Sequence, residues 1–505
     1  MNHRSSNDNL PKVLWASERS EHSTDQCDCA CADTRLSHSD PSSICFQPDL
    51  LCHSSPGTRL TPLTDNWRLA LQPLGRFVPV VINEPASEFL DYFHIPRCPE
   101  EVVSAFSYWD SSVVEDAMQW LIITELIIPK GCTSVHPPNN TSTLTAWLHL
   151  TDRCNLRCAY CYLPHFREDM PSETGRAAVD AAFRSAEKQG FQQIKLKYSG
   201  GEPLIRFPLV LELHQYAQAL AEQNGLSLDG VVLSNGTLLT TEIVEALKTT
   251  GIRLMISLDG LGDIHDSQRS YASGRSSFAD VAEAVELALT HSLTPDISIT
   301  VSGRTAAGLP EVIAWVLERD LPFSLNFYRE NDFSTTHTDL AFEEETILNG
   351  MAAVFKVIEA NLPHRSLLAS LMDRANLIAP HYRTCGVGQN YLVFDQRGQV
   401  AKCQMQIGKT IATVHNDDPL TLIRADQNGI QNLSFEEKES CRDCQWRYWC
   451  AGGCPLETYR VTGRYDVKSP HCNIYQALFP EVLRLEGLRL LKYQDDPQVV
   501  QKIVL

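Results

Sequence analysis

The sequence predicts an α/β protein built around a partial (β/α)6 barrel, with a small N-terminal winged-helix (α+β) module and a cysteine-rich C-terminal domain. Three observations lead to this expectation. Strand and helix patterns alternate from Trp147 onward, cysteines gather in two dense arrays, and short strands followed by helical patterns precede the barrel. Because a strand, a helix and a second parallel strand form a right-handed crossover, repeated units of this kind make a curved parallel sheet. Functional groups are then expected at the carboxyl ends of its strands.

Size and charge limit the possible partners. The chain has 505 residues, of which 43% are hydrophobic and 21% charged, as in ordinary proteins of several globular domains. Its 43 Lys plus Arg against 62 Asp plus Glu give a net charge of -19, so nucleic acid and anionic membranes are not expected as main partners. The opening residues lack the apolar core of a signal peptide, and the longest apolar run, 120–129, is interrupted by Thr124 and Glu125. We therefore expect a cytoplasmic protein without a membrane partner.

Residues 1–62 are expected to form a poorly ordered tail, because they are rich in Ser, Asp, His and Asn. Cys27, Cys29 and Cys31 form a close triplet within this tail. The triplet is a candidate metal ligand, but no matching His or Cys spacing lies nearby, so free thiols are the alternative.

Residues 63–135 are expected to form the winged-helix module. Val80, Val81 and Ile82 indicate a short strand, three helical patterns follow, and residues 126–128 indicate another strand. This topology resembles the PqqD-like precursor-recognition domains of peptide-modifying enzymes, in which an extended leader peptide adds to an edge strand. A cap on the barrel without a binding role is the alternative.

The barrel is expected over residues 140–345, followed by a helical bridge over 346–375. Each predicted strand is followed by a turn and, in most repeats, by a helical pattern. The predicted strands are 146–150, 194–198, 230–234, 253–258, 296–301 and 324–327, and the predicted helices include 172–188, 241–249, 278–289 and 309–318.

The loop after the first barrel strand carries Cys154, Cys158 and Cys161, with three and then two residues between them. Thiolates favour iron-sulfur clusters or zinc, and this spacing lets one short loop bind three corners of a four-iron cluster. No cysteine occurs between Cys161 and Cys385, so nothing nearby in the sequence completes a closed site of four thiolates. The pattern indicates a cluster with one iron that is free to bind a cofactor.

The Cys-x3-Cys-x2-Cys spacing, with an aromatic residue before the last cysteine, resembles the signature of radical S-adenosylmethionine enzymes. This resemblance implies a [4Fe-4S] cluster whose open iron binds S-adenosylmethionine. After the second strand come Gly200, Gly201 and Glu202, where two glycines permit a close backbone approach and a carboxylate can pair with an ammonium group. By the same resemblance this motif binds the methionyl amino group of the cofactor. Taken alone, it is more typical of an ordinary turn, and its place one strand after the cysteine loop is what favours a function.

Further cofactor contacts are expected at the ends of the next strands. Ser234 and Asn235 follow the third strand and Ser257 lies at the end of the fourth, although each is also compatible with a simple turn. Arg269 lies in a segment that resembles the anaerobic sulfatase-maturase-like group, where a serine and an arginine contact the cofactor's carboxylate and ribose. A guanidinium suits a carboxylate because its fork pairs with both oxygens. Tyr160 is expected near the adenine.

The resemblance also implies a reaction. Reduction of the cluster leads to cleavage of the cofactor into methionine and a 5'-deoxyadenosyl radical, which takes a hydrogen atom from an unactivated carbon. The protein positions the substrate and excludes competing donors. An external electron donor such as flavodoxin or ferredoxin is an expected partner. No catalytic acid or base can be selected from the many Asp and Glu residues.

The second cysteine array lies within residues 376–485, ahead of a C-terminal tail expected over 486–505. Its spacing, Cys-x12-Gly-x4-Cys and then Cys-x2-Cys-x5-Cys-x3-Cys with a last Cys, resembles the SPASM pattern. A zinc ribbon is the alternative, but seven ligands cannot fill two closed four-thiolate zinc sites. The array consists of Cys385, Cys403, Cys441, Cys444, Cys450, Cys454 and Cys472.

The SPASM resemblance implies two auxiliary [4Fe-4S] clusters, and hence three clusters in the protein. One would be held by Cys441, Cys444, Cys450 and Cys472, and the other by Cys385, Cys403 and Cys454. Some relatives have an eighth cysteine shortly before the first of these, and this chain has none. One iron of this second cluster is therefore either left without a protein ligand or bound by His381 or by an N-terminal cysteine. Auxiliary clusters suit an oxidation, because they can accept the second electron from a substrate radical. Trp446, Tyr448 and Trp449 are expected to pack around them.

The sequence therefore predicts a radical S-adenosylmethionine maturase that oxidatively modifies a ribosomally made precursor peptide bound through its leader. A crosslink, a thioether, or a rearrangement of backbone or side chain are all compatible with the ligand spacing. An anaerobic sulfatase maturase that makes formylglycine is the alternative, weakened because that group does not need a leader-binding module. A non-enzymatic iron-sulfur sensor or relay is a second alternative, which leaves the Gly-Gly-Glu motif and Arg269 unexplained.

Overall fold

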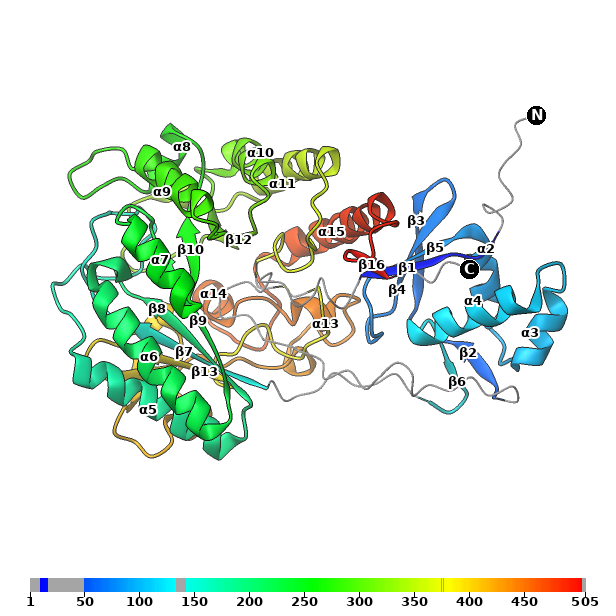
Figure 1. The fold of residues 1–505 in the computed structure, drawn as a ribbon, viewed down its shortest axis with the longest axis horizontal. Coiled ribbons are helices and arrows are strands. Elements are labelled where there is room, and N and C mark those ends of the chain that lie inside the picture. Colours follow the sequence, from blue (N-terminus) through cyan, green and yellow to red (C-terminus); the bar gives the residue numbers. More distant parts are fainter. Residues whose placement is uncertain (1–9, 17–49, 133–141, 374, 376, 502–505) are drawn as a thin grey trace.

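The protein, seen in a computed structural model, consists of a large α/β unit and a smaller N-terminal unit (Figure 1). The structure describes residues 10–16, 50–132, 142–373, 375 and 377–501. The large unit contains an open sheet of nine strands and the N-terminal unit a sheet of five. Helix α15 (Cys472–Lys492) contacts both units.

Six parallel strands form the centre of the large unit, in the order β12-β11-β10-β9-β8-β7. Each overlaps a strand predicted from the sequence, so the predicted fold class is confirmed. Most of their side chains are buried, as expected for parallel strands covered on both faces. The strands are β7 (Thr143–His149), β8 (Gln193–Ser199), β9 (Ser227–Ser234), β10 (Arg253–Ser257), β11 (Asp296–Val301) and β12 (Phe323–Phe327).

Helices follow these strands and cover the sheet (Figure 1). Three of them end at a glycine in the left-handed conformation, Gly190, Gly225 or Gly251, which lets the chain turn back into the next strand. Their apolar sides and the sheet share one large core. The helices are α5 (Ser172–Gln189), α6 (Phe207–Asn224), α7 (Thr241–Thr250), α8 (Asp263–Gln268), α9 (Phe278–Thr290) and α10 (Leu309–Glu318).

The cysteine-rich domain extends the same sheet, which the sequence did not predict. Strand β13 (Tyr391–Phe394) lies parallel to β7, and β14 (Gln399–Ala401) and β15 (Thr410–Thr413) continue the sheet in antiparallel order. The first barrel strand therefore has a neighbour on both sides. The sheet stays open, with β12 and β15 at its ends.

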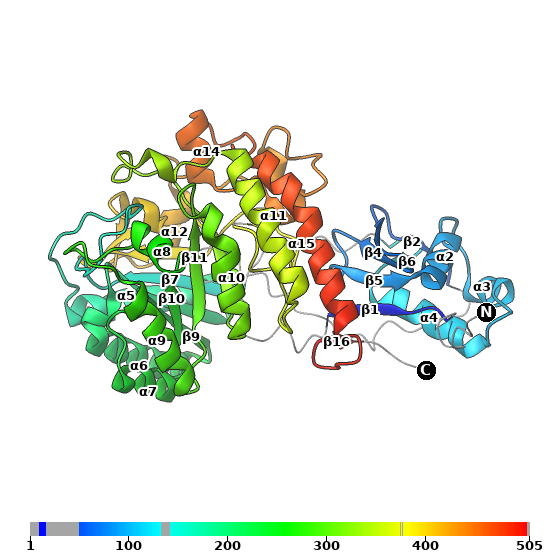
Figure 2. The same ribbon diagram turned by 90° about the horizontal axis from the view of Figure 1, so that it is seen from above.

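Helices of the C-terminal half complete the large unit. Helix α11 (Glu344–Ala360), which falls in the predicted bridge, lies between α10 and α15 (Figure 2). Three shorter helices lie in the cysteine-rich domain: α12 (Pro419–Ala425), α13 (Arg447–Cys450) and α14 (Pro455–Thr462).

The N-terminal unit contains the strands and three helices expected of the small module. Its sheet includes the hairpin β3 (Arg59–Thr64) and β4 (Trp67–Leu71) and then β5 (Val80–Asn83). Its helices are α2 (Glu84–Tyr92), α3 (Pro99–Ala105) and α4 (Ser111–Ile123). A separate pair joins β2 (Cys52–Ser54) to β6 (Ile127–Pro129). A core of its own, which includes Phe89, Phe106 and Trp120, holds the unit together.

Both expected tails contain strands, so two expectations need correction. Strand β1 (Val13–Ala16) pairs with β5, and β16 (Val500–Gln501) pairs with β1, giving the order β16-β1-β5-β4-β3. Residues 1–62 are therefore not a tail throughout, since 13–16, 52–54 and 59–62 form strands, and residues 486–505 begin within α15. Burial of Val13, Leu14 and Trp15 explains why a short polar-flanked segment is held in place. Cys27, Cys29 and Cys31 lie outside the described residues.

Among the described residues, no helix is both long enough and apolar enough to cross a membrane.

A buried ion pair fixes α15 against the loop after α11. Arg489 donates to Glu486 (2.6 Å) and to the backbone oxygen of His364 (2.6 Å), and both charged side chains are fully buried. Glu486 also accepts from Ser366 (3.1 Å) and from the backbone N–H of Leu367 (2.9 Å). The position of this helix thus depends on a compensated pair of buried charges.

We expect Arg489→Leu to lower the free energy of unfolding by about 3–5 kcal/mol, because Glu486 would remain buried without its cation. The double variant Glu486→Leu/Arg489→Leu should be less destabilised than Arg489→Leu. Urea unfolding of anaerobically purified protein measures both. Arg176→Leu, which removes a half-exposed pair with Glu212, is the control and should cost less than about 1 kcal/mol. Equal losses for Arg489→Leu and Arg176→Leu would contradict this account.

Candidate functional site

The first cysteine loop follows β7 and is held by backbone hydrogen bonds to the end of α8 and to the segment after it. Arg157 N–H donates to the oxygen of Ser270 (2.8 Å), and Ala159 N–H donates to that of Gln268 (2.8 Å). Cys154, Cys158 and Cys161 are all partly buried. The loop is thus fixed at the carboxyl end of the first strand, where the sequence predicted it.

The two glycines after β8 lie directly against this loop. Gly201 N–H donates to the oxygen of Thr151 (2.6 Å), and Glu202 N–H donates to that of Arg153 (2.8 Å). A Cβ at Gly200 would lie 2.5 Å from the Thr151 oxygen, and one at Gly201 would lie 2.4 Å from the Arg153 oxygen. The glycines therefore permit a close approach to the cysteine loop, in addition to any approach to a ligand that the sequence predicted.

The Glu202 carboxylate is fully buried at the end of β8. It accepts hydrogen bonds from Leu204 N–H (3.0 Å), Ser234 Oγ (2.8 Å) and Asn235 N–H (2.8 Å). Burial raises the pKa of Glu202, and these hydrogen bonds act in the opposite direction. An ammonium group placed beside this carboxylate would meet an oriented hydrogen-bond acceptor, and the contact of Glu202 with the cofactor's amino group stays a prediction. Ser234 and Asn235 hold Glu202 in place, a role that the sequence did not predict.

Arg269 and Tyr160 form a buried group with Asp259, which follows β10. The Tyr160 hydroxyl donates to Asp259 (2.7 Å), and Arg269 donates to the Tyr160 oxygen and lies 3.6 Å from Asp259. The Nε of Arg269 is buried without a hydrogen-bond partner. Asn331 Nδ2 donates to the backbone oxygen of Tyr160 (3.0 Å). The guanidinium thus stands close to the cysteine loop with one donor unused.

Ser257, the last residue of β10, lies one residue beyond Ile256, which pairs with Ser234 on β9. The structure therefore brings together the ends of β8, β9 and β10, as the sequence predicted. Asp259 and Asn331 are contacts that were not predicted. Asp259 was visible in the Asp-Gly pair after the fourth strand, whereas nothing in the sequence connects Asn331 with Tyr160.

The thiols of the first loop lie in surroundings that disfavour a free thiolate. Burial raises the pKa of the Cys154 thiol to about 11 and that of Cys158 to about 12, and Arg269 opposes both shifts. Iron ions bind thiolates and compensate their charge, so a cluster fits this donor set. The Glu202 carboxylate lies near Cys154 in this loop, and the open fourth position stays a prediction from the sequence.

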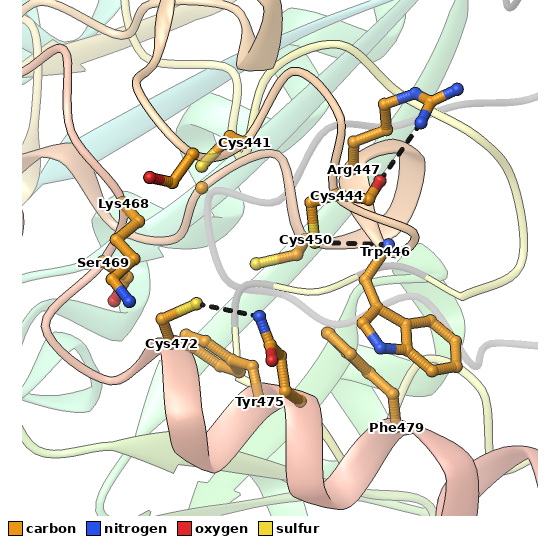
Figure 3. A pocket seen from close by; sticks show the side chains of 13 residues that line it. Cys441, Cys444, Trp446, Arg447, Cys450, Lys468, Ser469, Cys472, Tyr475 and Phe479 are labelled. Carbon is orange, nitrogen blue, oxygen red and sulfur yellow. Dashed lines mark hydrogen bonds between the residues drawn. The ribbon is translucent and has the colours of Figure 1, made fainter.

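A second cysteine group lines a small cavity between the loop before α13 and the start of α15 (Figure 3). Burial raises the pKa of the Cys441 thiol to about 11 and that of Cys450 to about 12. Trp446 and Phe479 line the same cavity, with ring centroids 5.2 Å apart. The cysteines that line it are the four that the sequence assigned to one auxiliary cluster, Cys441, Cys444, Cys450 and Cys472.

The remaining cysteines of the array lie together in a separate apolar cluster. Cys385, Cys403 and Cys454 are buried there with Trp147 and Tyr391. Asn432 Nδ2 donates to the Cys385 backbone oxygen (2.6 Å) and lies 3.7 Å from its sulfur. The array thus divides into the same two groups that the sequence predicted.

His381 is one of the fourth ligands considered for this group. It is buried, its Nδ1 lies 3.3 Å from the Ala379 oxygen, and its Nε2 has no hydrogen-bond partner. Burial lowers the pKa of His381 to about 4, which keeps the imidazole neutral and suitable as a ligand. Cys52, an N-terminal cysteine, lies in the core of the N-terminal unit.

Among the described residues, no three His, Cys, Asp or Glu side chains are close enough to share a single metal ion. A four-iron cluster gives each cysteine its own iron and does not require such convergence.

The aromatic residues near these cysteines differ in their surroundings. Trp446 lines the cavity. The ring of Trp449 lies in the core, with its centroid 5.6 Å from that of Trp446. Tyr448 instead packs against Phe435, with ring centroids 5.2 Å apart. Lys438, which the sequence did not single out, is buried near both cysteine groups and donates to the Ala451 oxygen (2.8 Å).

Comparison with known proteins agrees with this geometry. Residues 148–316 match the model of the Radical SAM superfamily. The uncharacterised protein MJ0907 of Methanocaldococcus jannaschii is 29% identical over 171 residues, which are 34% of this chain and 57% of that protein. The cysteine-type anaerobic sulfatase-maturating enzyme of Clostridium perfringens is 22% identical over 326 residues, covering 60% of this chain and 85% of that enzyme. The serine-type anaerobic sulfatase-maturating enzyme of Klebsiella pneumoniae is 23% identical over 351 residues, covering 65% of this chain and 85% of that enzyme.

Among solved structures, native anSMEcpe with bound AdoMet superposes with a TM-score of 0.56 at 18% identity, over 68% of this chain and 99% of that chain. This similarity shows a shared fold. The family match shows a radical SAM domain over residues 148–316 and, with the sulfatase-maturating relatives, an enzyme of the radical SAM class. A [4Fe-4S] cluster and S-adenosylmethionine are the cofactors that this class implies.

We expect Gly201→Ala to reduce iron binding by the first loop, because the new Cβ would meet the Arg153 backbone oxygen at 2.4 Å. Anaerobic reconstitution followed by iron and sulfide analysis and electron paramagnetic resonance measures the loss. Gly408→Ala is the matched control, since nothing lies within 4 Å of a Cβ at that position. A first cluster of normal content and signal in Gly201→Ala would show that the close approach is unnecessary.

Proposed function

We propose that this enzyme oxidatively modifies a ribosomally made peptide by radical chemistry, with three [4Fe-4S] clusters and S-adenosylmethionine. The observation that carries the proposal is the direct backbone contact between the cysteine loop and the Gly-Gly-Glu segment. This contact holds the three thiols of the loop next to the buried Glu202 carboxylate. When bound, the cluster and the cofactor supply a one-electron cleavage that yields a radical able to abstract hydrogen.

The residues around the first loop have separate tasks in this proposal. Cys154, Cys158 and Cys161 hold the cluster, and Glu202 binds the ammonium group of the cofactor, held in place by Ser234 and Asn235. Arg269, with its unused Nε, contributes a cation for the cofactor's carboxylate or ribose. Tyr160 and Ser257 are the remaining proposed contacts to the cofactor. Asp259 orients Arg269 and Tyr160.

The second cysteine array serves the oxidation. A substrate radical must lose one further electron to give a stable product, and buried clusters are suited to accept it. Cys441, Cys444, Cys450 and Cys472 hold one auxiliary cluster around the cavity of Figure 3. Cys385, Cys403 and Cys454 hold the other. Its fourth position is left open or taken by His381.

A peptide is the proposed substrate. The solved structures of relatives include anSMEcpe with bound AdoMet and the Cp18Cys peptide, which shows that this fold accommodates a peptide in that protein. The N-terminal unit here adds a sheet with three helices, the arrangement expected of a leader-binding module. In this proposal the enzyme works in the cytoplasm with a flavodoxin or ferredoxin as electron donor, and it binds neither nucleic acid nor a membrane.

Formation of formylglycine on a sulfatase remains the second candidate. It is favoured by the 22% and 23% identity to enzymes named anaerobic sulfatase-maturating enzymes. Formylglycine formation gives the N-terminal unit no role.

We expect Glu202→Gln to weaken S-adenosylmethionine binding by about 10- to 100-fold, because a charged partner of the ammonium is lost and an amide N–H₂ would face donors. Isothermal titration of the anaerobically reconstituted protein measures the affinity. Glu222→Gln, an exposed change on α6, is the control. Unchanged binding in Glu202→Gln would remove Glu202 from the cofactor site.

The reaction itself is tested by reduction in the presence of S-adenosylmethionine and a candidate peptide. We expect 5'-deoxyadenosine to form and the mass of a leader-bearing precursor peptide to fall by the mass of the hydrogen atoms removed. Cys450→Ala should retain formation of 5'-deoxyadenosine and lose the modified peptide, because it affects only an auxiliary cluster. Conversion of a sulfatase peptide to formylglycine, with no change in the precursor, would favour the second candidate.

A further inference from the structure

The edge of the N-terminal sheet is filled by a distant part of the chain. Strand β1 lies against β5, with Val13 opposite Ile82 and Leu14 opposite Val81. On its other side, Trp15 and Ala16 pair with β16. Helices α4 and α15 also contact β1. Residues 10–16 thus lie between β5, β16 and these two helices, and the place that they fill is called the groove below.

Side chains of β1 alternate between two apolar environments. Val13 and Trp15 belong to the core of the N-terminal unit, where the Trp15 ring lies 5.9 Å from that of Phe77. Leu14 belongs instead to the core shared with the large unit. Each of the three is about 2% exposed. The groove therefore accepts an extended segment with consecutive apolar residues directed to opposite sides.

Asn83 also forms hydrogen bonds with the backbone of residues 10–16. The Asn83 side chain donates to the oxygen of Leu10 (2.7 Å) and accepts from the N–H of Lys12 (2.8 Å), and Asn83 N–H donates to the Lys12 oxygen (3.2 Å). These bonds involve only main-chain groups of residues 10 and 12. Any extended peptide can make them, which is how peptides add to sheet edges in general.

The rest of the unit does not need β1 for its connectivity. Strands β3, β4 and β5 and helices α2, α3 and α4 follow one another within residues 59–123. By contrast, β1 precedes them and is joined to Leu50 by residues 17–49, a stretch of 33 positions. It is thus linked to the groove as a tethered segment would be.

We propose that this groove is the peptide-binding site of the N-terminal unit and that residues 10–16 are its tethered occupant, displaced by an extended peptide with neighbouring apolar residues. This inference rests on the proposed function, because it gives the leader of the substrate peptide a place to bind. It makes the N-terminal segment a competitive inhibitor within the same chain.

The tether sets the strength of the competition. Because β1 belongs to the same chain as the groove, a free peptide competes with an intramolecular occupant, whose effective concentration we take as about 1 mM. A free peptide of equal intrinsic affinity at about 10 µM would then occupy the groove of about 1% of the molecules. A substrate leader must therefore bind the empty groove about 100-fold better than residues 10–16 do, which makes the occupant a filter against weakly binding peptides.

Hydrogen exchange of the wild-type chain tests whether β1 opens independently. The amides of residues 13–16 should exchange at least 10-fold faster than those of β4 and β5, because they open without unfolding of the unit. Exchange of all three strands at one common rate would overturn the proposal, since β1 would then be an inseparable part of the fold.

Binding of a labelled synthetic peptide that spans residues 8–18 tests the groove itself. In the full chain with Val13→Glu and Trp15→Glu, the buried carboxylates expel the tethered segment, and the peptide should bind at least 30-fold more tightly than to the wild type. Thr61→Glu with Thr64→Glu adds the same charge to the exposed edge strand β3 and should leave binding as in the wild type. Equal binding by the first variant and the wild type, or loss of amide protection in β4 and β5 of that variant, would overturn the proposal.

Formation of 5'-deoxyadenosine, measured on the same preparations, separates this inference from the proposed function. A groove that binds the peptide in a protein that never cleaves the cofactor would count against the proposed chemistry alone. Cofactor cleavage without any gain in peptide binding would count against the groove alone.

Discussion

The arrangement of the candidate site depends on the backbone contact between two loops that follow neighbouring strands. Gly201 and Glu202 donate to the oxygens of Thr151 and Arg153, so the cysteine loop and the Glu202 carboxylate cannot move separately. Because any side chain at either glycine would meet main-chain oxygen, the sequence at this point is restricted by the neighbouring loop. The order of β7 and β8 in the sheet brings these two loops together. Fold and chemistry are therefore linked through a few hydrogen bonds.

Burial changes the pKa values of the groups in this site. Thiols, a carboxylate and a guanidinium gather beyond the carboxyl ends of the strands, and burial raises the pKa of Cys158 and of Glu202. Each charged form needs a partner of opposite sign, and Arg269 alone cannot serve all of them. Metal ions and a cationic cofactor are the partners that compensate such a set. The same reasoning applies to the cysteines around the cavity of Figure 3, where desolvation also dominates.

Local patterns predicted the barrel well because each strand and helix carries its own apolar periodicity. The predicted strand at 296–301 and helix at 309–318 agree with the observed bounds, and the Gly-Gly-Glu motif was placed correctly. Pairings between distant segments were not predicted. Strand β13 joins β7 across more than two hundred residues, and β1 and β16 come from opposite ends of the chain. Short segments such as these have too few residues for a periodic pattern, and only their partners define them. The link between Asn331 and Tyr160 was missed for the same reason.

Helix α15 extends from the cysteine-rich domain to the N-terminal unit, so its length fixes the distance between them. Its first residue, Cys472, lines the cavity of Figure 3, and Gly487 lies against Leu69 of β4, where a Cβ would come within 2.7 Å. Fifteen residues of α-helix separate the two points, a span of about 22 Å. An extended chain covers about 3.3 Å per residue, so a peptide must have about seven residues to stretch across this distance. If the proposed peptide substrate is held on the N-terminal unit beside this end of α15, at least about seven extended residues must separate the held part from any part that reaches Cys472.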